Sequence, residues 1–304
     1  MPQIQQIQQY AGHTGSIFAL ALDAHNQLLY SSGDDGIVAC WDLKDKSGKA
    51  TALLRMPHAV YGLEVIPEKK VLIAGASEGS LSFVDLETNK LRKQYARNRE
   101  AIYQIKFLPD SNSIWILHGG GWLSVLDADS LEERFFDKIS AENLRDVVAL
   151  NGLAYVAASD GAIYVLDEKK QAEISRMEAH ENSVFSLCMD AAGKKLFSGG
   201  RDAQLCVWDV EHGLEKTDQI PAHMYTINAL ALSPDEQYLV SASRDKTIKL
   251  WDVHSHALLK VIDHARHDGH THSVNRILWL ESDDSVISCG DDRRILRWKF
   301  TLNN

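Results

Sequence analysis

The feature that most constrains the fold is a set of four residue types that recurs at one fixed spacing. A histidine is followed 18 residues later by a serine, 4 residues after that by an aspartate, and 6 residues further by a tryptophan. Such internal repeats stack so that they share one continuous core. The spacing is repeated without change in four stretches: His13, Ser31, Asp35 and Trp41; His180, Ser198, Asp202 and Trp208; His223, Ser241, Asp245 and Trp251; and His270, Ser288, Asp292 and Trp298.

One copy, residues 223–252, shows what a unit folds into. Its apolar-rich runs 227–232 and 238–241 are separated by Ser-Pro-Asp-Glu, a turn cluster in which proline presets φ. A second turn leads into 247–251, where Ile248 and Leu250 alternate with polar residues. Each unit therefore predicts three short strands joined by two tight turns, followed by an outer strand in the connection to the next unit.

Three weaker copies fill the middle of the chain. Glu78 and Gly120 stand where the second and third units should have the turn aspartate, whereas Asp160 keeps it in the fourth. The residue that closes the third strand marks all seven units, and it falls at positions 41, 84, 126, 166, 208, 251 and 298.

The chain resembles the WD40 repeat family, with Trp-Asp at 41–42, 208–209 and 251–252 and Gly-His at 12–13 and 269–270. The spacing between units also agrees with the family period of roughly 40–45 residues. The resemblance implies an all-β, seven-bladed β-propeller of four-stranded antiparallel blades, as a single domain over residues 1–304. In that family the leading strand completes the last blade. Here it would pair residues 3–10 with 294–300 and close the ring, which removes unpaired sheet edges.

The composition is that of an ordinary globular protein, with 45% hydrophobic and 24% charged residues. No apolar run approaches the roughly 18 residues of a membrane span, and the N-terminus lacks a basic region followed by an apolar stretch. The net charge of −10 argues against a general nucleic-acid binder. We therefore expect no nucleic-acid and no membrane partner, and a cytoplasmic location. Cys40, Cys188, Cys206 and Cys289 follow no CxxC pattern, and we interpret them as reduced, buried thiols.

The recurring His, Ser, Asp and Trp residues admit two interpretations. Ser, His and Asp form the triad of many hydrolases, but a triad would occur once rather than in four separate units. In the WD40 family these residues form a hydrogen-bond chain across the blade. The donor and acceptor types match, since an indole N–H only donates, a hydroxyl or imidazole does both, and a carboxylate accepts. We interpret the four tetrads as structural and assign no catalytic residue.

A group of histidines before the last unit raises the question of a metal site. Its residue types are those that bind Zn²⁺ or Ni²⁺, yet one of them, His270, already belongs to a structural tetrad. The other histidines are expected on a solvated loop without fixed geometry, so we assign no metal and no cofactor. The group consists of His264, His267, His270 and His272 with Asp263 and Asp268.

The repeat pattern does not explain the second residue of each first strand. In WD40 proteins this position lines the narrow face around the central channel, and the seven residues here are Phe18, Tyr61, Tyr103, Arg145, Phe185, Asn228 and Asn275. The residue before the turn aspartate tends to face the same way, which adds Asp34, Ser77, Ser159, Arg201, Arg244 and Asp291. Aromatic residues flanked by arginines are typical of interface hot spots. The alternative is that the aromatic rings only pack between blades.

The function expected from these observations is that of a non-enzymatic scaffold, a monomeric propeller within a larger complex, that binds a protein or peptide on its narrow face. Two alternatives remain because one fold hosts many functions. The first is an enzyme or a small-ligand or metal-binding propeller with a site at the channel mouth, for which Asp34 and Asp291 are the available carboxylates. The second is a purely architectural subunit that uses its outer rim.

Overall fold

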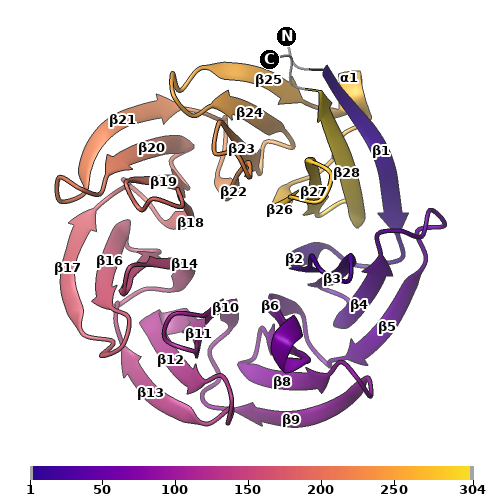
Figure 1. The fold of residues 1–304 in the computed structure, drawn as a ribbon, viewed down its shortest axis with the longest axis vertical. Coiled ribbons are helices and arrows are strands. Elements are labelled where there is room, and N and C mark those ends of the chain that lie inside the picture. The colour runs from indigo at the N-terminus through magenta and orange to yellow at the C-terminus, as the bar shows by residue number, and fades with distance from the viewer. Residues whose placement is uncertain (1–2, 302–304) are drawn as a thin grey trace.

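Seven four-stranded antiparallel sheets stand side by side in a closed ring (Figure 1). The computed structural model describes residues 3–301. In each sheet the strands follow chain order from the centre of the ring to its rim, except that one sheet takes its rim strand from the N-terminus. The prediction of a seven-bladed β-propeller is confirmed. Blades are numbered one to seven in the order of their innermost strands.

Each blade presents its first strand to the centre of the ring, and its second strand pairs with the first. The first strands are β2 (Ile17–Asp23), β6 (Val60–Ile66), β10 (Ile102–Leu108), β14 (Leu144–Leu150), β18 (Val184–Met189), β22 (Ile227–Leu232) and β26 (Val274–Leu280). The second strands are β3 (Leu28–Gly33), β7 (Val71–Ala76), β11 (Ser113–His118), β15 (Leu153–Ala158), β19 (Lys195–Gly200), β23 (Tyr238–Ser243) and β27 (Ser285–Gly290).

The third and outer strands complete each blade toward the rim. The third strands are β4 (Ile37–Asp42), β8 (Ser80–Asp85), β12 (Trp122–Asp127), β16 (Ala162–Asp167), β20 (Gln204–Asp209), β24 (Ile248–Asp252) and β28 (Arg294–Thr301). The outer strands are β5 (Ala50–Arg55), β9 (Lys90–Ala96), β13 (Glu133–Lys138), β17 (Glu173–Glu178), β21 (Glu215–Pro221), β25 (Leu258–Ile262) and β1 (Gln3–Ala11). Three short helical turns are η1 (Pro67–Lys69), η2 (Gly119–Gly121) and α1 (His264–His267).

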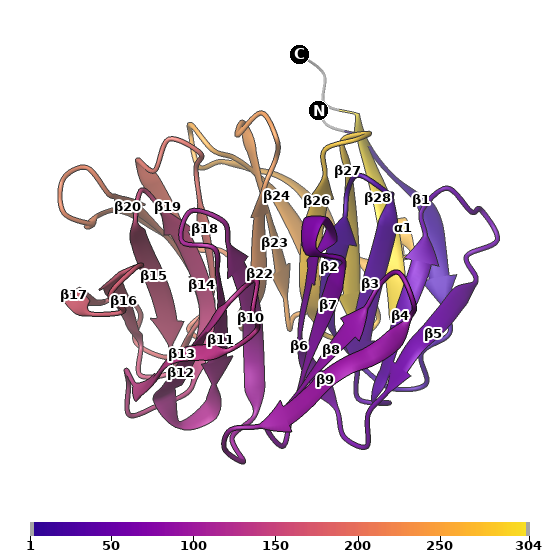
Figure 2. The same ribbon diagram turned by 60° about the horizontal axis from the view of Figure 1, so that its bottom comes forward.

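Strand β1 closes the ring by pairing with β28 along its whole length, from Gln3 opposite Thr301 to Ala11 opposite Arg294. The predicted closure is therefore confirmed. A bulge between Gln6 and Gln8 leaves Ile7 outside the ladder and exposed. This bulge explains why the isoleucine spacing in the sequence does not follow a regular strand pattern. The side view in Figure 2 shows β1 beside β28, with the strands of all blades running between the two faces of the ring.

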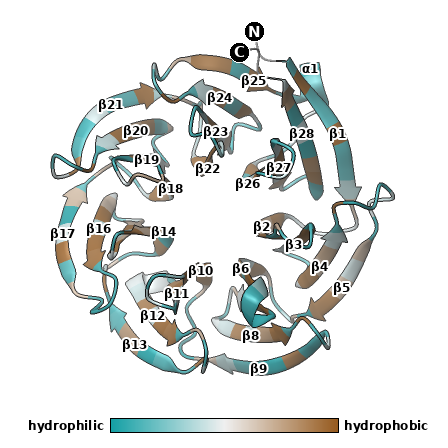
Figure 3. Cartoon of the chain, viewed as in Figure 1, coloured by the Kyte–Doolittle hydropathy of each residue, from teal (hydrophilic) through white to brown (hydrophobic). Residues whose placement is uncertain are grey.

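The core lies between blades rather than inside any one of them. Each of the seven apolar clusters joins residues of two neighbouring blades. The cluster at the seam of blades seven and one, for example, packs Tyr10 and Ile287 against Ile17 and Trp41. Hydrophilic residues predominate on outer strands such as β1, β13 and β17 and in the connecting loops (Figure 3). Neighbouring blades therefore hold one another in place through apolar contact, as repeat architectures do.

The four His-Ser-Asp-Trp tetrads form four equivalent hydrogen-bond chains. The tryptophan N–H lies 2.7 to 2.9 Å from the serine Oγ, and the serine Oγ lies 2.7 to 2.8 Å from the histidine Nε2. The histidine Nδ1 then lies within 2.8 to 3.0 Å of an aspartate oxygen. Because the indole can only donate, the serine hydroxyl donates to Nε2 and Nδ1–H donates to the carboxylate. The serine and the tryptophan of each chain are buried, and so is the side chain of each histidine.

The pKa shifts of three tetrad residues, His223, Asp245 and Asp202, follow from this arrangement. Burial lowers the pKa of His223, which keeps the imidazole neutral, as the direction of the hydrogen bonds requires. Burial works to raise the pKa of Asp245, but hydrogen bonds from His223 and Thr247 outweigh burial and hold the pKa below its ordinary range. The pKa of Asp202 is lowered for the same reason, against the effect of burial, with His180 as the main partner. Each chain thus ends in an ionised carboxylate.

Blades two and four lack the tetrad and fill its place differently. In blade two the positions of histidine, serine and tryptophan are taken by Met56, Ala74 and Val84, all buried. In blade four Asp160 remains, and its Oδ2 accepts hydrogen bonds from Ser140 Oγ at 2.7 Å and from the Tyr164 hydroxyl at 2.6 Å. Blade two therefore fills these positions with apolar side chains, and Glu78 in its turn accepts a hydrogen bond from Ser80 Oγ. Blade four has a shorter polar chain.

Blade three keeps an imidazole but takes it from another strand. Asn98 stands in the tetrad histidine's place, four residues before the first strand, and the imidazole of His118 comes instead from the end of β11. Blade five has Gly200 there, where a Cβ atom would collide with His180. Because blade three has no histidine in that loop, its second strand has room for one. His118 Nε2 lies 2.9 Å from Ser124 Oγ, and burial lowers the pKa of His118 to about 4.

Candidate functional site

The second residue of every first strand is a β-bulge. In blade one Ile17 pairs with Gly33 and Ala19 with Ser32, so Phe18 has no partner in the ladder. The same register shift occurs in the other six blades. A bulge bends the strand and re-aims the side chain of the extra residue. The seven side chains are thereby freed from the ladder at the end of the ring where the first strands begin.

These seven side chains converge on one cavity of about 170 Å³, which we call the axial pocket. It opens on the face that carries the starts of the first strands and the turns between second and third strands, here called the narrow face. All of its lining residues are half-buried. The lining consists of Phe18, Tyr61, Tyr103, Arg145, Phe185, Asn228, Asn275 and Arg276. The seven residues singled out from the sequence therefore meet in one place, and Arg276 joins them.

A continuous row of rings and one guanidinium forms the wall of the axial pocket across blades one to five. Phe18 meets Tyr61 edge-on with ring centroids 5.0 Å apart, and Tyr61 stacks on Tyr103 at 5.9 Å. The Arg145 guanidinium lies 4.2 Å from the Tyr103 ring and 4.8 Å from the Phe185 ring. The rings therefore pack across the blade seams and face the pocket at the same time. Contacts of both kinds fix their orientation before any ligand arrives.

A hydrogen bond fixes Arg145 in addition to the two rings that flank its guanidinium. Its Nε donates to Ser159 Oγ at 2.7 Å, so a residue on the turn after β15 orients the guanidinium. Burial lowers the pKa of Arg145, and the nearby positive charge of Arg201 acts in the same direction. An arginine never deprotonates at physiological pH. Arg145 is therefore a fixed, partly desolvated cation beside apolar rings.

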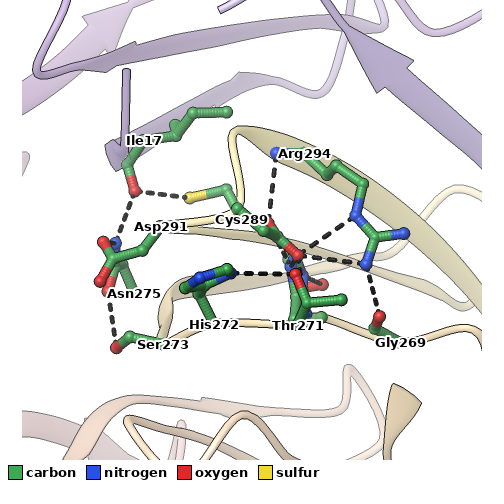
Figure 4. A network of polar contacts seen from close by, with 12 residues as sticks. Ile17, Gly269, Thr271, His272, Ser273, Asn275, Cys289, Asp291 and Arg294 are labelled. Atoms are coloured by element: carbon green, nitrogen blue, oxygen red, sulfur yellow. Dashed lines mark hydrogen bonds and ion pairs between the residues drawn. The ribbon is translucent and has the colours of Figure 1, made fainter. Parts of the chain in front are cut away.

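The two asparagines use their amide groups to join neighbouring blades, and Figure 4 shows the contacts of Asn275. Asn275 Nδ2 donates to the Ile17 carbonyl at 2.9 Å and to Asp291 Oδ1 at 2.8 Å, and Ser273 donates to Asn275 Oδ1. Asn228 Nδ2 donates to the carbonyl of Val274 in blade seven at 2.8 Å. Their N–H groups are thus already engaged, and on this side of the pocket the asparagines act mainly as braces.

Arg201 and Arg244 lie on the narrow face but outside the axial pocket. Both are exposed on turns between second and third strands, where the Arg244 amide donates to the Thr226 carbonyl. That contact brings the loop before β22 beside Arg244. The loop carries Met224 and Tyr225, which are 81% and 62% exposed, and sequence reasoning missed both. The signal available in the sequence was a pair of large apolar residues directly after the tetrad histidine of the unit.

Sequence reasoning also missed a polar bridge across the channel, one residue further along the first strands. Arg276 Nη2 in blade seven donates to Gln104 Oε1 in blade three at 3.2 Å, and Gln104 Nε2 donates to Asp146 Oδ1 in blade four at 3.0 Å. Blade three lies across the ring from blade seven (Figure 1). A second cavity of about 340 Å³ continues along the channel, and Arg276 lines both cavities. We call Arg276, Gln104 and Asp146 the channel bridge.

The histidine group before blade seven does not form the irregular loop expected from the sequence. Residues His264–His267 form the helical turn α1, which Asp263 caps by accepting from the Arg266 amide at 2.9 Å. The Arg266 side chain also binds Asp263, and His264 Nδ1 lies 3.1 Å from the Gly269 carbonyl. Local hydrogen bonds therefore give this segment a fixed geometry. Across residues 3–301, no three His, Cys, Asp or Glu side chains come together in a group that could hold a metal ion.

The two carboxylates considered for an enzyme are not placed as a pair in the pocket. Asp34 is exposed on the turn after β3, and Asp291 accepts the Asn275 amide. The four cysteines are free thiols, and burial raises the pKa of Cys40 and of Cys206 to about 11. Within the part of the chain that the structure describes, no helix has the length and apolar character needed to cross a membrane.

The comparison with family models matches four of the seven units. The model described as WD domain, G-beta repeat matches residues 4–42, 171–209, 214–252 and 263–299, together about half of the chain. The first three segments run from an outer strand to the third strand of the next blade, and the fourth begins just after β25 and ends within β28. Together they include the four complete tetrads. Blades two and three and the first three strands of blade four lie outside the matches.

Curated relatives match at low identity. A "U3 small nucleolar RNA-associated protein 15 homolog" from Gallus gallus is 27% identical over 187 residues, which cover 60% of this chain and 35% of that protein. "WD repeat-containing protein AAC3" from Dictyostelium discoideum is 23% identical over 68% of this chain and 36% of its own length. "Protein groucho" from Drosophila melanogaster is 25% identical over 61% of this chain and 26% of its own length. The matched region thus spans about a third or less of these relatives.

Proposed function

The chain belongs to the WD40 family, and from that membership and the geometry of its narrow face we propose that it is an interaction scaffold that binds a peptide segment of a protein partner. The observation that carries the proposal is the convergence of seven bulge side chains on one axial pocket. Their rings and guanidinium are oriented by one another and by Ser159. A preorganised aromatic wall loses little conformational entropy when it buries an apolar side chain.

The rim of the axial pocket adds a second kind of contact. Arg201 and Arg244 are exposed on adjacent blades, and the ion pairs within residues 3–301 include neither of them. The protein as a whole carries a net charge of −10. An exposed pair of guanidinium groups in such a protein favours a partner carboxylate, which arginine can bind in a bidentate geometry. The proposed ligand is therefore a peptide with an apolar anchor for the pocket and an acidic residue near it.

Met224 and Tyr225 extend this footprint over blade six. Both are strongly exposed and lie next to the turn that carries Arg244. Aromatic residues, methionine and arginine are the types enriched in interface cores. A bound segment that runs outward from the axial pocket over blades five and six would contact all of these side chains.

The test is to pan a library of short random peptides on the protein and to measure the affinity of the enriched peptides. Tyr61→Ala combined with Tyr103→Ala should weaken binding at least about 30-fold, because central aromatic anchors contribute most of an interface's energy. Leu91→Ala combined with Ile174→Ala is the matched control, since both side chains are exposed on the outer strands β9 and β17. Loss of binding in the rim variant, with full binding in the folded tyrosine variant, would move the site to the outer rim.

The proposal includes a reducing, cytoplasmic location. The four cysteines are free thiols, the form that persists in a reducing compartment. Fluorescence imaging of the tagged protein in its native cells checks the location.

A further inference from the structure

Resting on the proposed function, we infer that the axial pocket receives the last residue of a partner chain and binds its free α-carboxylate through Arg276. The proposal adds a substrate class to the site, since it distinguishes a C-terminal residue from an internal side chain. Three observations lead to it: the floor of the pocket, the unused donors of Arg276, and the charge of the lining.

The channel bridge forms a floor beneath the pocket. Arg276 donates a hydrogen bond across the channel to Gln104, and Gln104 donates one to Asp146 in the next blade. The axial pocket, at about 170 Å³, has room for a single residue rather than for a threaded chain. A segment that enters from the narrow face meets the channel bridge after about one residue. A chain end satisfies this geometry without a turn.

Arg276 has donors to spare at this floor. Its side chain makes one hydrogen bond within residues 3–301, from Nη2 to Gln104 Oε1, while a guanidinium has five N–H groups. No ion pair in the same part of the chain includes Arg276. A half-buried guanidinium with free N–H groups is suited to a carboxylate, which accepts two parallel hydrogen bonds.

Asp146 does not neutralise Arg276 directly. The glutamine separates the two, and the carboxylate of Asp146 is already occupied by the Gln104 amide and by the backbone amides of Val147 and Leu187. The bridge thus orients Arg276 with a neutral side chain and leaves its positive charge uncompensated.

The rest of the lining matches a C-terminal residue. The axial pocket contains no carboxylate among its lining residues, and its second guanidinium, Arg145, is fixed between Tyr103 and Phe185. The rings of Phe18 and Tyr61 continue the apolar wall. One residue that carries both an apolar side chain and a carboxylate would therefore meet rings with the first and guanidinium groups with the second. Only the last residue of a chain combines these two features in one backbone unit.

The experiment uses short peptides displayed on phage with free C-termini, followed by synthesis of each enriched peptide as the free acid and as the C-terminal amide. We expect amidation to weaken binding to the wild-type protein about 10-fold or more, because a hydrogen-bonded charge is lost. In Arg276→Gln the acid and the amide should bind with similar affinity. Arg55→Gln, a substitution at an exposed arginine of β5, is the control and should keep the wild-type preference.

Other results would overturn the inference in distinguishable ways. Equal binding of acid and amide to the wild-type protein, abolished by the tyrosine double variant, would remove the carboxylate contact and leave the proposed function intact. Enrichment only of peptides with an internal acidic residue would do the same. Absence of any binder to the pocket would overturn both proposals. If Arg276→Gln fails to fold, Arg276→Lys supplies the test: the preference for the acid should shrink but persist, and an undiminished preference would exclude the bidentate contact.

Discussion

The seven blades have the same backbone arrangement but fall into two groups by their interiors: blades one, five, six and seven, and blades two, three and four. The first group holds loop, turn and strand together with the complete tetrad. In the second group, blade two uses apolar side chains, blade three uses His118 with Ser124, and blade four uses Asp160 with Ser140 and Tyr164. A buried polar network is stabilising only when it is complete, and well-packed apolar residues can replace it. The propeller therefore requires a filled interior at this level, and the tetrad is one of several ways to fill it.

The narrow face draws on both groups of blades. The blades without a tetrad supply Tyr61, Tyr103 and Arg145 to the axial pocket and Gln104 and Asp146 to the channel bridge. The tetrad blades six and seven supply two asparagines whose amides are used between blades, and blade seven also supplies Arg276. Tetrad blades one and five complete the aromatic wall with Phe18 and Phe185. The pocket is therefore not confined to the blades in which the repeat pattern is weakest.

Both kinds of blade depend on ring closure, so removing the closing strand should have the largest effect. Deletion of residues 1–10 takes away Tyr10, which is buried against Trp41 with ring centroids 5.7 Å apart, and leaves β28 as an open edge. We expect aggregation or loss of cooperative unfolding, measured by size-exclusion chromatography and thermal melting. Ile7→Ser is the control, because this bulge residue is exposed and should change stability by only about 0.5 kcal/mol. A truncated protein that stays monomeric with unchanged melting would show that closure is dispensable.

The contribution of a complete tetrad is the next largest. Asp202→Ala leaves the His180 Nδ1–H group without its acceptor inside a buried chain, and breaking such a network costs about 3–5 kcal/mol. Glu173→Ala, at an exposed position of β17, should cost about 0.5 kcal/mol or less. Chemical denaturation of the two variants measures the difference. Equal stabilities would mean that apolar contact alone holds the tetrad blades, and the comparison would fail.

Blade three should also respond to pH through His118, with the smallest effect of the three. His223 of blade six adds to the response in the same direction, because burial lowers its pKa as well. Burial lowers the pKa of His118 to about 4 from 6.5, so an unfolded chain binds a proton that the folded protein excludes. Stability should therefore fall as the pH drops from about 6.5 to 4, by up to about 3 kcal/mol. Asp202 affects stability at lower pH. Its pKa is lowered from 3.8, so its stabilising contacts are lost only when the pH falls below 3.8 and the carboxylate is protonated. The free energy of unfolding, measured by denaturation at several pH values in this range, should change less with pH for His118→Asn than for the wild-type protein. His25→Asn, at an exposed position, should show the wild-type dependence on pH. An equally weakened dependence in His25→Asn would mean that the pH response does not come from blade three.

The sequence predicted what repeats and missed what occurs once. The seven units and the second residues of the first strands, from Phe18 onward, follow from regular spacing, and spacing is preserved by backbone geometry. Closure by residues 3–10 followed from the resemblance to the WD40 family. The channel bridge was missed because Arg276 contacts Gln104, 172 residues away, and no periodicity relates them. The third position of the first strands offers a signal, since Gln104, Asp146 and Arg276 have polar side chains where blades one, two and six have Ala19, Gly62 and Ala229.

The pairing of β1 with β28 has a consequence for how the chain acquires its structure. Among the strands of the propeller, β1 leaves the ribosome before all others and pairs with β28, which is made after all others: Gln3 lies opposite Thr301. At ordinary synthesis rates this partner arrives on the order of 15 to 60 s later. Throughout that interval the N-terminal segment and the growing row of blades keep unpaired edges, which other chains can join. Contacts of such long sequence separation also slow the final folding step. Ring closure is therefore the folding step before which the chain is most exposed to pairing with the edges of other chains.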